Sequence, residues 1–326
     1  MAVDLPKRFG WVGLGAMGWP MATQLLKNST AELLIFDVDQ PVLHRFASEA
    51  PDGRVQIATS SKQVADESED MSKMFTCRQK LDYWRETRPE RSSSTGKAWQ
   101  CSQSVTDQSS SSTIDIETSL AVGEAVRTSD PENPAIFLDC PVSGGTAGAA
   151  KGIITFMCGI AADDEMFPLL HAILKNMGRS INPMGGRGLG LAAKLSNNYL
   201  SGIIALATSE AMNLGMKLGI DPKVLSDCFN EGSAANWVNS TVNPVPGVCP
   251  EAVTSKCYEG GFKVQLMEKD MKLASAAAQN VGARLVLGET AIGAYTSAAA
   301  DPRYRGKDSR VVYKWLVGGD PGTDNA

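Results

Sequence analysis

The stretch Phe9-Gly10-Trp11-Val12-Gly13-Leu14-Gly15-Ala16-Met17-Gly18 decides the fold of this 326-residue chain. Residues 9–14 form a short apolar run, which predicts a buried strand, and residues 16–27 predict a helix directly after it. A second predicted strand covers residues 33–36 and ends at Asp37. Because strand, glycine turn, helix and strand in this order form a βαβ unit, we expect a parallel sheet.

The glycines of this stretch have the G-x-G-x-x-G spacing of a dinucleotide-binding turn. Gly13 would permit the tight turn, Gly15 would let a pyrophosphate approach the backbone, and Gly18 would let the helix pack on the strand. Asp37, at the end of the next strand, would accept hydrogen bonds from ribose hydroxyls and repel a 2′-phosphate, which favours NAD over NADP. A glycine turn that serves packing alone is the less favoured alternative.

Composition limits the classes of function. The length indicates about two domains, and 43% hydrophobic with 21% charged residues is typical of a globular enzyme. A net charge of −5 gives no general attraction to nucleic acid, and no apolar run reaches membrane-spanning length. Seven cysteines without a C-x-x-C pair and two histidines indicate neither a disulfide scaffold nor a metal centre. We therefore expect no nucleic-acid, membrane or metal partner.

The rest of the chain separates into two halves. Further strands are predicted at residues 136–142, 153–159 and 180–184, and helices at residues 191–218, 222–230, 264–281 and 285–299. The predicted fold class is therefore α/β, a doubly wound (Rossmann) parallel sheet followed by an all-α domain. We expect a dinucleotide-binding domain over residues 8–187 and a helical domain over residues 188–317.

The segment from residue 67 to residue 111 does not fit this pattern. Between Glu67 and Ser112 the only Val, Ile or Leu residues are Leu81 and Val105, whereas there are eleven serines. So little apolar area cannot offset the entropy of ordering, which predicts a flexible insertion or a disordered loop. An α/β half of this size should carry a strand here, and residues 71–77 are the nearest candidate. A misread exon or a frame error is a further hypothesis for this segment.

The motif Asp139-Cys140-Pro141-Val142-Ser143-Gly144-Gly145 runs from a predicted strand into a turn of small residues. Ligands of open parallel sheets bind beyond such strand ends. The backbone N–H groups of Ser143, Gly144 and Gly145, together with the serine hydroxyl, would form an anion nest for a carboxylate. A tight turn without a ligand is an equally good interpretation of the spacing.

Two helices carry the remaining polar candidates. On the first, Lys194, Asn198 and Ser201 share one face of a helix that is apolar on nearly all sides, so the lysine either reaches water or carries a function. Desolvation would bring its pKa toward working pH, which suits a general acid/base. On the second, Asp270 shares an apolar stripe and is expected to have a polar partner. Alone, Lys269 and Asp270 are more typical of a structural ion pair on a solvated face.

These four motifs, in this order, resemble those of the β-hydroxyacid dehydrogenase family, and within it the 3-hydroxyisobutyrate dehydrogenases. The match covers residues 9–53 and 112–316 and includes Tyr258-Glu259-Gly260-Gly261-Phe262 ahead of Lys269. The departure is the segment from 67 to 111, where the family has an apolar strand followed by a helix and a strand. The resemblance implies that the helical domain binds substrate and supports oligomerisation.

The resemblance also assigns roles by position. It implies that Lys194 is the catalytic general acid/base and that the substrate is bound by Ser143, Gly144, Gly145 and Asn198. It adds Thr113 and Lys269 to the residues that bind the cofactor, which are then Gly13, Leu14, Gly15, Met17, Gly18, Asp37, Thr113 and Lys269.

The implied activity is the NAD-dependent oxidation of 3-hydroxyisobutyrate to methylmalonate semialdehyde, a step of valine degradation, by a homodimer or homotetramer. Two alternatives stay open: a related reductase of tartronate or succinic semialdehyde, and a non-catalytic dinucleotide-binding protein. The N-terminal residues show no transit peptide, so we expect a cytoplasmic protein on this sequence, or a mitochondrial one if the N-terminus is incomplete.

Overall fold

The computed structural model describes residues 5–51, 53–67, 74–76, 114–128 and 136–322. The chain divides into two compact units, Met1–Lys194 and Leu195–Ala326, which we call the first and second unit. The division falls inside the long helix α8 (Leu189–Lys217), so one continuous helix contributes to both units.

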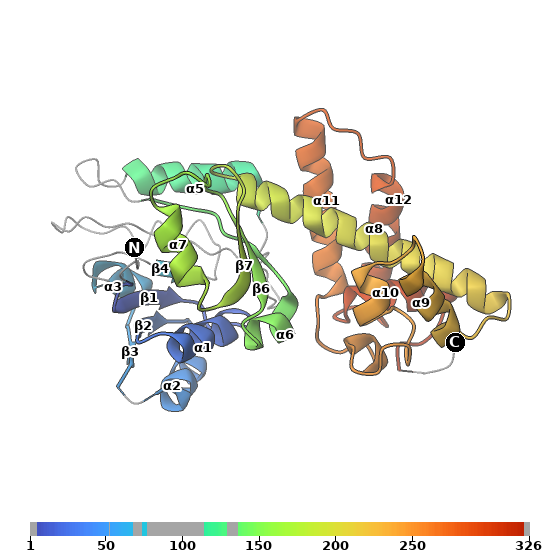
Figure 1. Ribbon diagram of the computed structural model, residues 1–326, viewed down its shortest axis with the longest axis horizontal. Helices are drawn as coiled ribbons and strands as arrows, with labels where there is room; N and C mark the ends of the chain where they lie inside the picture. Colours follow the sequence, from blue (N-terminus) through green and yellow to red (C-terminus); the bar gives the residue numbers. More distant parts are fainter. Residues whose placement is uncertain (1–4, 52, 68–73, 77–113, 129–135, 323–326) are drawn as a thin grey trace. The chain divides into compact units, whose positions relative to one another are not determined.

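The first unit is built on a parallel sheet with the strand order β3-β2-β1-β4 (Figure 1). Its strands are β1 (Arg8–Val12), β2 (Glu32–Phe36), β3 (Val55–Ile57) and β4 (Met74–Thr76). The helices that follow these strands are α1 (Gly18–Asn28), α2 (Gln40–Glu49) and α3 (Ser61–Glu67), with α5 (Ile116–Thr128) further along the chain. The order β3-β2-β1 is one half of a doubly wound sheet and β4 begins the other half, which confirms the predicted fold class.

Strand β4 lies within residues 71–77, the strand candidate that the sequence offered in this segment. Its three residues pair in parallel with Gly10–Val12 of β1. Composition alone predicted a flexible loop over the whole segment, because composition does not report the pairing that stabilises a short strand. The remainder of the segment, residues 68–73 and 77–111, lies outside the described residues.

A second sheet of three strands has the order β5-β6-β7. It contains β5 (Val142–Ser143), β6 (Ile154–Cys158) and β7 (Gly178–Pro183), with the helices α6 (Gly145–Ala150) and α7 (Phe167–Leu174) between them. The strands predicted at 153–159 and 180–184 are confirmed. Of the strand predicted at 136–142, only Val142 lies in an observed strand, β5. Strand β5 pairs antiparallel with β6, whereas a parallel sheet was expected. Pro141 has no N–H to donate, so only its carbonyl takes part in the pairing, where it accepts the Met157 N–H at 2.9 Å.

Apolar side chains from both sheets and their helices form one continuous core in the first unit. Phe9, Trp11, Met21, Leu33 and Phe156 are each at most 1% exposed. Full burial of a large apolar side chain stabilises the fold by about 1.5–3 kcal/mol. The glycine loop and the Ser143 turn are therefore attached to a common, well-packed base.

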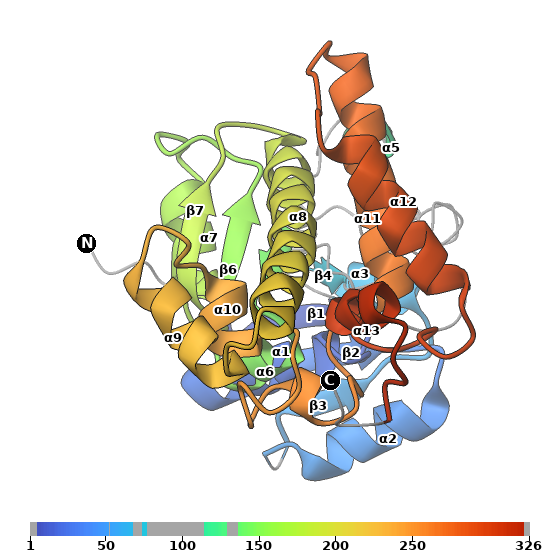
Figure 2. The same cartoon turned by 90° about the vertical axis from the view of Figure 1, so that its right-hand side faces the viewer.

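The second unit is helical. Besides most of α8 it contains α9 (Pro222–Glu231), α10 (Trp237–Val242), α11 (Val264–Asn280), α12 (Gly288–Ala300) and α13 (Val312–Val317), with short 3₁₀ turns at Val253–Ser255 and Ser309–Val311. Helices α11 and α12 pack side by side (Figures 1 and 2). The predicted helices at 222–230, 264–281 and 285–299 are confirmed, although α12 begins three residues later than predicted.

Two buried tyrosines of the second unit hold separate segments together, one joining two loops and the other joining helix α12 to helix α8. Tyr258 donates its hydroxyl to the Pro244 carbonyl at 2.6 Å, and Tyr295 donates to the Gly202 carbonyl of α8 at 2.9 Å. Burial raises the pKa of both phenols well above the ordinary value, so they remain neutral donors. In the part of the chain that the structure describes, no helix combines the length and apolar character needed to cross a membrane.

Candidate functional site

The glycine loop between β1 and α1 is held at its start by two hydrogen bonds to Gly13. Gly13 has φ +95°, which favours glycine, and its N–H donates to the Phe36 carbonyl at 2.9 Å. The indole Nε1 of Trp11 donates to the Gly13 carbonyl at 3.1 Å. The loop therefore leaves β1 through a turn that the neighbouring strand β2 and a buried indole both fix.

The loop is shaped to accept a phosphate group close to its backbone. Gly15 is exposed, and no atom lies within 4 Å of the place that a Cβ would occupy there. Met17 is 4% exposed and anchors the end of the loop, after which Gly18 opens α1. An open glycine just before a helix N-terminus fits the pyrophosphate of a dinucleotide.

Asp37 joins the end of β2 to the glycine loop. Its Oδ2 accepts the Leu14 N–H at 2.7 Å, and its Oδ1 accepts the Asp39 N–H at 3.1 Å. A carboxylate has about four lone-pair positions, so Asp37 retains acceptor capacity for ribose hydroxyls. No cation follows it in Val38–Gln40, and such a cation is what a 2′-phosphate would require.

The Ser143 turn opens helix α6. Ser143 ends β5, and the next two residues take positive φ angles, +130° at Gly144 and +63° at Gly145. Both glycines are exposed. Helix α6 packs against α1, where Gln24 Nε2 donates to the Ala150 carbonyl. The first unit thus places the helices of the glycine loop and of the Ser143 turn next to each other.

Asp139 links the same segment to the start of α8. It is 2% exposed, and its carboxylate accepts the N–H of Gly188 at 2.8 Å through Oδ1 and the N–H of Leu191 at 2.8 Å through Oδ2. Burial raises the pKa of this carboxyl, while the backbone N–H donors oppose the rise. The motif around Asp139 predicted no role for this carboxylate, although an acidic residue inside an apolar predicted strand is a signal for a buried partner.

Helix α8 carries Lys194 and Asn198 one turn apart, and both are buried, at 6% and 5% exposed. In the second unit, Asn198 Nδ2 donates to Asp270 Oδ2 at 2.5 Å, and Lys269 Nζ lies 2.8 Å from Asp270 Oδ1. The polar partner expected for Asp270 is confirmed. The prediction that this pair lies on a solvated face is wrong, because Asp270 is fully buried between the Asn198 amide and the Lys269 ammonium group.

The predicted site residues therefore fall into three groups. The first joins the glycine loop to Asp37, the second joins the Ser143 turn to the start of α8, and the third joins Asn198 to Lys269. Thr113 lies outside the described residues. Across residues 5–322 where described, no group of three or more His, Cys, Asp and Glu side chains has the arrangement to hold a metal ion.

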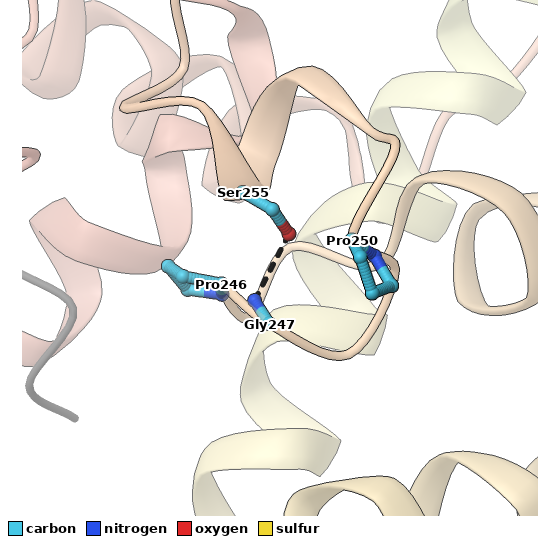
Figure 3. A pocket seen from close by; sticks show the side chains of 4 residues that line it. All are labelled: Pro246, Gly247, Pro250 and Ser255. Atoms are coloured by element: carbon cyan, nitrogen blue, oxygen red, sulfur yellow. Dashed lines mark hydrogen bonds between the residues drawn. The ribbon is translucent and has the colours of Figure 1, made fainter.

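A separate hollow in the second unit is lined by Pro246, Gly247, Pro250 and Ser255 (Figure 3). Its one polar side chain is already engaged, since Ser255 Oγ accepts the Gly247 N–H at 2.9 Å and donates to the Cys249 carbonyl at 2.8 Å. Because its lining offers no charged or unengaged polar group, this hollow does not resemble a catalytic site.

Two family models match this chain. Residues 8–186 match the family model described as the NAD binding domain of 6-phosphogluconate dehydrogenase, and residues 188–316 match the model described as NAD-binding of NADP-dependent 3-hydroxyisobutyrate dehydrogenase. The 3-hydroxyisobutyrate dehydrogenase of Pseudomonas aeruginosa is 35% identical over 95% of this chain and 98% of that protein. The human mitochondrial 3-hydroxyisobutyrate dehydrogenase is 33% identical over 94% of this chain and 86% of that protein.

A solved structure shares the fold as well. The Mycobacterium tuberculosis 3-hydroxyisobutyrate dehydrogenase, determined with L-serine, superposes with a TM-score of 0.78 at 27% identity. The alignment covers 96% of this chain and 99% of that one.

Proposed function

The chain belongs to the 3-hydroxyisobutyrate dehydrogenase family of NAD-dependent oxidoreductases, and from that premise we propose that it oxidises 3-hydroxyisobutyrate to methylmalonate semialdehyde in valine catabolism, with Lys194 as general acid/base. Membership of this family makes the chain an NAD-dependent hydroxyacid dehydrogenase. To this we add the substrate, the pathway and the role of Lys194.

In the proposed cofactor site, Gly13–Gly18 receives the pyrophosphate and Asp37 receives the adenosine ribose. The open space above Gly15 and the acceptor capacity of Asp37 support this assignment. The acidic character of the β2 end supports NAD over NADP. Lys269, which the resemblance places on the nicotinamide side, is the last of the proposed cofactor-binding residues that the structure describes.

In the proposed substrate site, Ser143, Gly144 and Gly145 bind the substrate carboxylate, and Asn198 orients the substrate. Lys194 takes the hydroxyl proton of the alcohol during oxidation and returns it in the reverse direction. The bound nicotinamide supplies the hydride acceptor. The protein contributes position and proton transfer, and both depend on side chains held in fixed rotamers.

The observation that carries the proposal is the burial of Lys194 on α8. A lysine is rarely kept at 6% exposure unless it is paired or has a function, because removing an ammonium group from water is costly. It lies on the helix whose start is bonded to the segment that ends in Ser143. We further propose a homodimer or homotetramer, with the region 188–317 serving substrate binding and assembly.

The experiment is an NAD-reduction assay with 3-hydroxyisobutyrate on wild type and Lys194→Ala. Loss of a general acid/base lowers kcat by about 10²- to 10⁴-fold, and we expect NAD affinity to change by less than about 3-fold. The matched control is Lys217→Ala, which removes an exposed lysine from the last turn of the same helix and should leave kcat unchanged. Near-normal turnover of Lys194→Ala would show that the lysine assignment is wrong.

Substrate identity is tested with a panel of short hydroxy acids and their semialdehydes in both directions. A kcat/KM for 3-hydroxyisobutyrate at least 10-fold above that for the other compounds supports the proposed substrate. Faster reduction of tartronate or succinic semialdehyde would replace it with the reductase alternative.

A further inference from the structure

We propose that Asp139 is a positioning residue for Lys194: its carboxylate fixes the first turn of α8, and with it the lysine, to the segment that carries Ser143–Gly145. This inference rests on the proposed function, in which Lys194 and the Ser143 turn act on one substrate. All the residues that carry it belong to the first unit.

The start of α8 has no capping side chain of its own. The residue before the helix is Gly188, with φ +77°, and the first N–H groups of any helix lack intrahelical partners. Asp139 supplies the missing acceptors from 49 and 52 residues away, at 2.8 Å to Gly188 and at 2.8 Å to Leu191. Each oxygen serves a different N–H, so the bond pair fixes the helix end in two directions.

Two glycines leave room for this carboxylate. A Cβ at Gly159 would lie 2.1 Å from Asp139 Oδ1, and a Cβ at Gly190 would lie 2.8 Å from Asp139 Oδ2. A local capping side chain at position 188 is disfavoured, because the positive φ there favours glycine and a Cβ would lie 3.0 Å from Ile116 Cγ2. The distant cap does one thing that a local cap cannot do: it ties α8 to the segment of Asp139.

The connection from Asp139 to the substrate turn is short and rigid. The carbonyls of Asp139 and Pro141 both accept backbone N–H groups from the β6 side, and Ser143 pairs directly with Thr155 of β6. On the helix side, Lys194 follows Leu191 by three residues, which is nearly one turn. The buried side chain of Asp139 therefore holds Lys194 and the Ser143 turn in a fixed position relative to each other.

A double-mutant cycle tests this role. Asp139→Asn keeps the shape but can accept only one of the two N–H groups, because its amide nitrogen is a donor. We expect its kcat to fall by about 10- to 100-fold, since a misplacement of 1 Å can cost about 10² in rate. The Kd for NAD should stay within about 2-fold. In the Lys194→Ala background, the same substitution should lower kcat by less than about 3-fold, because the group that it positions is gone.

The outcomes separate this inference from the proposed function. If Lys194→Ala alone keeps its kcat, the proposed function fails. If Lys194→Ala loses kcat but Asp139→Asn costs the same factor in both backgrounds, only the positioning role is overturned. Should Asp139→Asn not fold, Asp139→Ser, which is smaller and keeps one hydroxyl acceptor, is run through the same cycle.

The matched control is Asp221→Ala. Asp221 caps α9 by accepting the N–H groups of Lys223 and Val224, so its loss removes a comparable cap far along the sequence. It should lower the melting temperature and leave kcat unchanged in both backgrounds. A kcat loss equal to that of Asp139→Asn would show that any lost cap lowers activity, and it would overturn the specific role of Asp139.

Discussion

Substituting Gly159 by alanine tests the Asp139 contact without changing any charged group. The new Cβ would lie 2.1 Å from Asp139 Oδ1 and 2.7 Å from its Cγ, whereas ordinary contacts need about 3.5 Å, so the carboxylate must retreat by more than about 1 Å. The 2.8 Å bond to Gly188 then exceeds hydrogen-bond length. Overpacking costs about 1–3 kcal/mol, and a lost bond to a charged group costs about 1.5–3 kcal/mol.

Because these two costs overlap, we expect Gly159→Ala to destabilise the first unit by about 3 kcal/mol, which corresponds to about 6–12 °C in Tm for a unit of this size. Differential scanning calorimetry of the full chain measures the shift. The matched control is Gly293→Ala in α12, where no atom lies within 4 Å of the new Cβ and the substitution should stabilise by about 0.5–1 kcal/mol. A Tm for Gly159→Ala within about 1 °C of wild type would refute the argument.

Three further predictions concern other positions. Asp37→Ala should raise the Kd for NAD by about 10-fold or more and reduce the ratio of the NADP Kd to the NAD Kd, since bonds to a charged acceptor contribute about 1.5–3 kcal/mol. Titrations that give the same two Kd values for wild type and the variant would contradict this prediction. Gly261 has φ +64°, and a Cβ there would lie 2.1 Å from Asp308 Oδ2, so Gly261→Ala should lower the free energy of unfolding in urea by about 2–4 kcal/mol. Gly282 has a similar φ of +70° but open space around a new Cβ, so Gly282→Ala should lower it only by the backbone strain of about 1–2 kcal/mol. Burial raises the folded-state pKa of Asp139, so its contribution to stability is fully present below the ordinary pKa of an aspartate and is lost as the pH rises through the folded-state value. The unfolding free energy of wild type minus that of Asp139→Asn should therefore fall as the pH rises from about 4. A difference that rises with pH would contradict burial as the cause of the shift.

The elements that could be predicted from the sequence are those with strong local patterns. The glycine spacing and the apolar run before it predicted β1 and α1, and helical periodicity predicted α8 within two residues at its start. The short helix α10 was missed, because six residues carry too little periodicity to distinguish a helix from a loop, and β4 was predicted only as a candidate within residues 71–77.

The partners of the site residues could not be predicted in the same way. Asp270 and Asn198 are 72 residues apart, and Asp139 and Leu191 are 52 apart, so no local spacing reports either pair. What the sequence did supply was the requirement for a partner, since an acidic residue in an apolar stripe must be satisfied when it is buried. The identity of that partner depends on tertiary packing.

The bond between Asp37 and the Leu14 N–H has a consequence for how nucleotide affinity is built. Ordering a backbone costs about 1–2 kcal/mol per residue, and here folding already meets that cost, because hydrogen bonds from the protein's own β2 and Asp37 shape the loop. The nucleotide arrives at a preorganised surface, so its association is expected to follow a single kinetic phase and to require no separate ordering step.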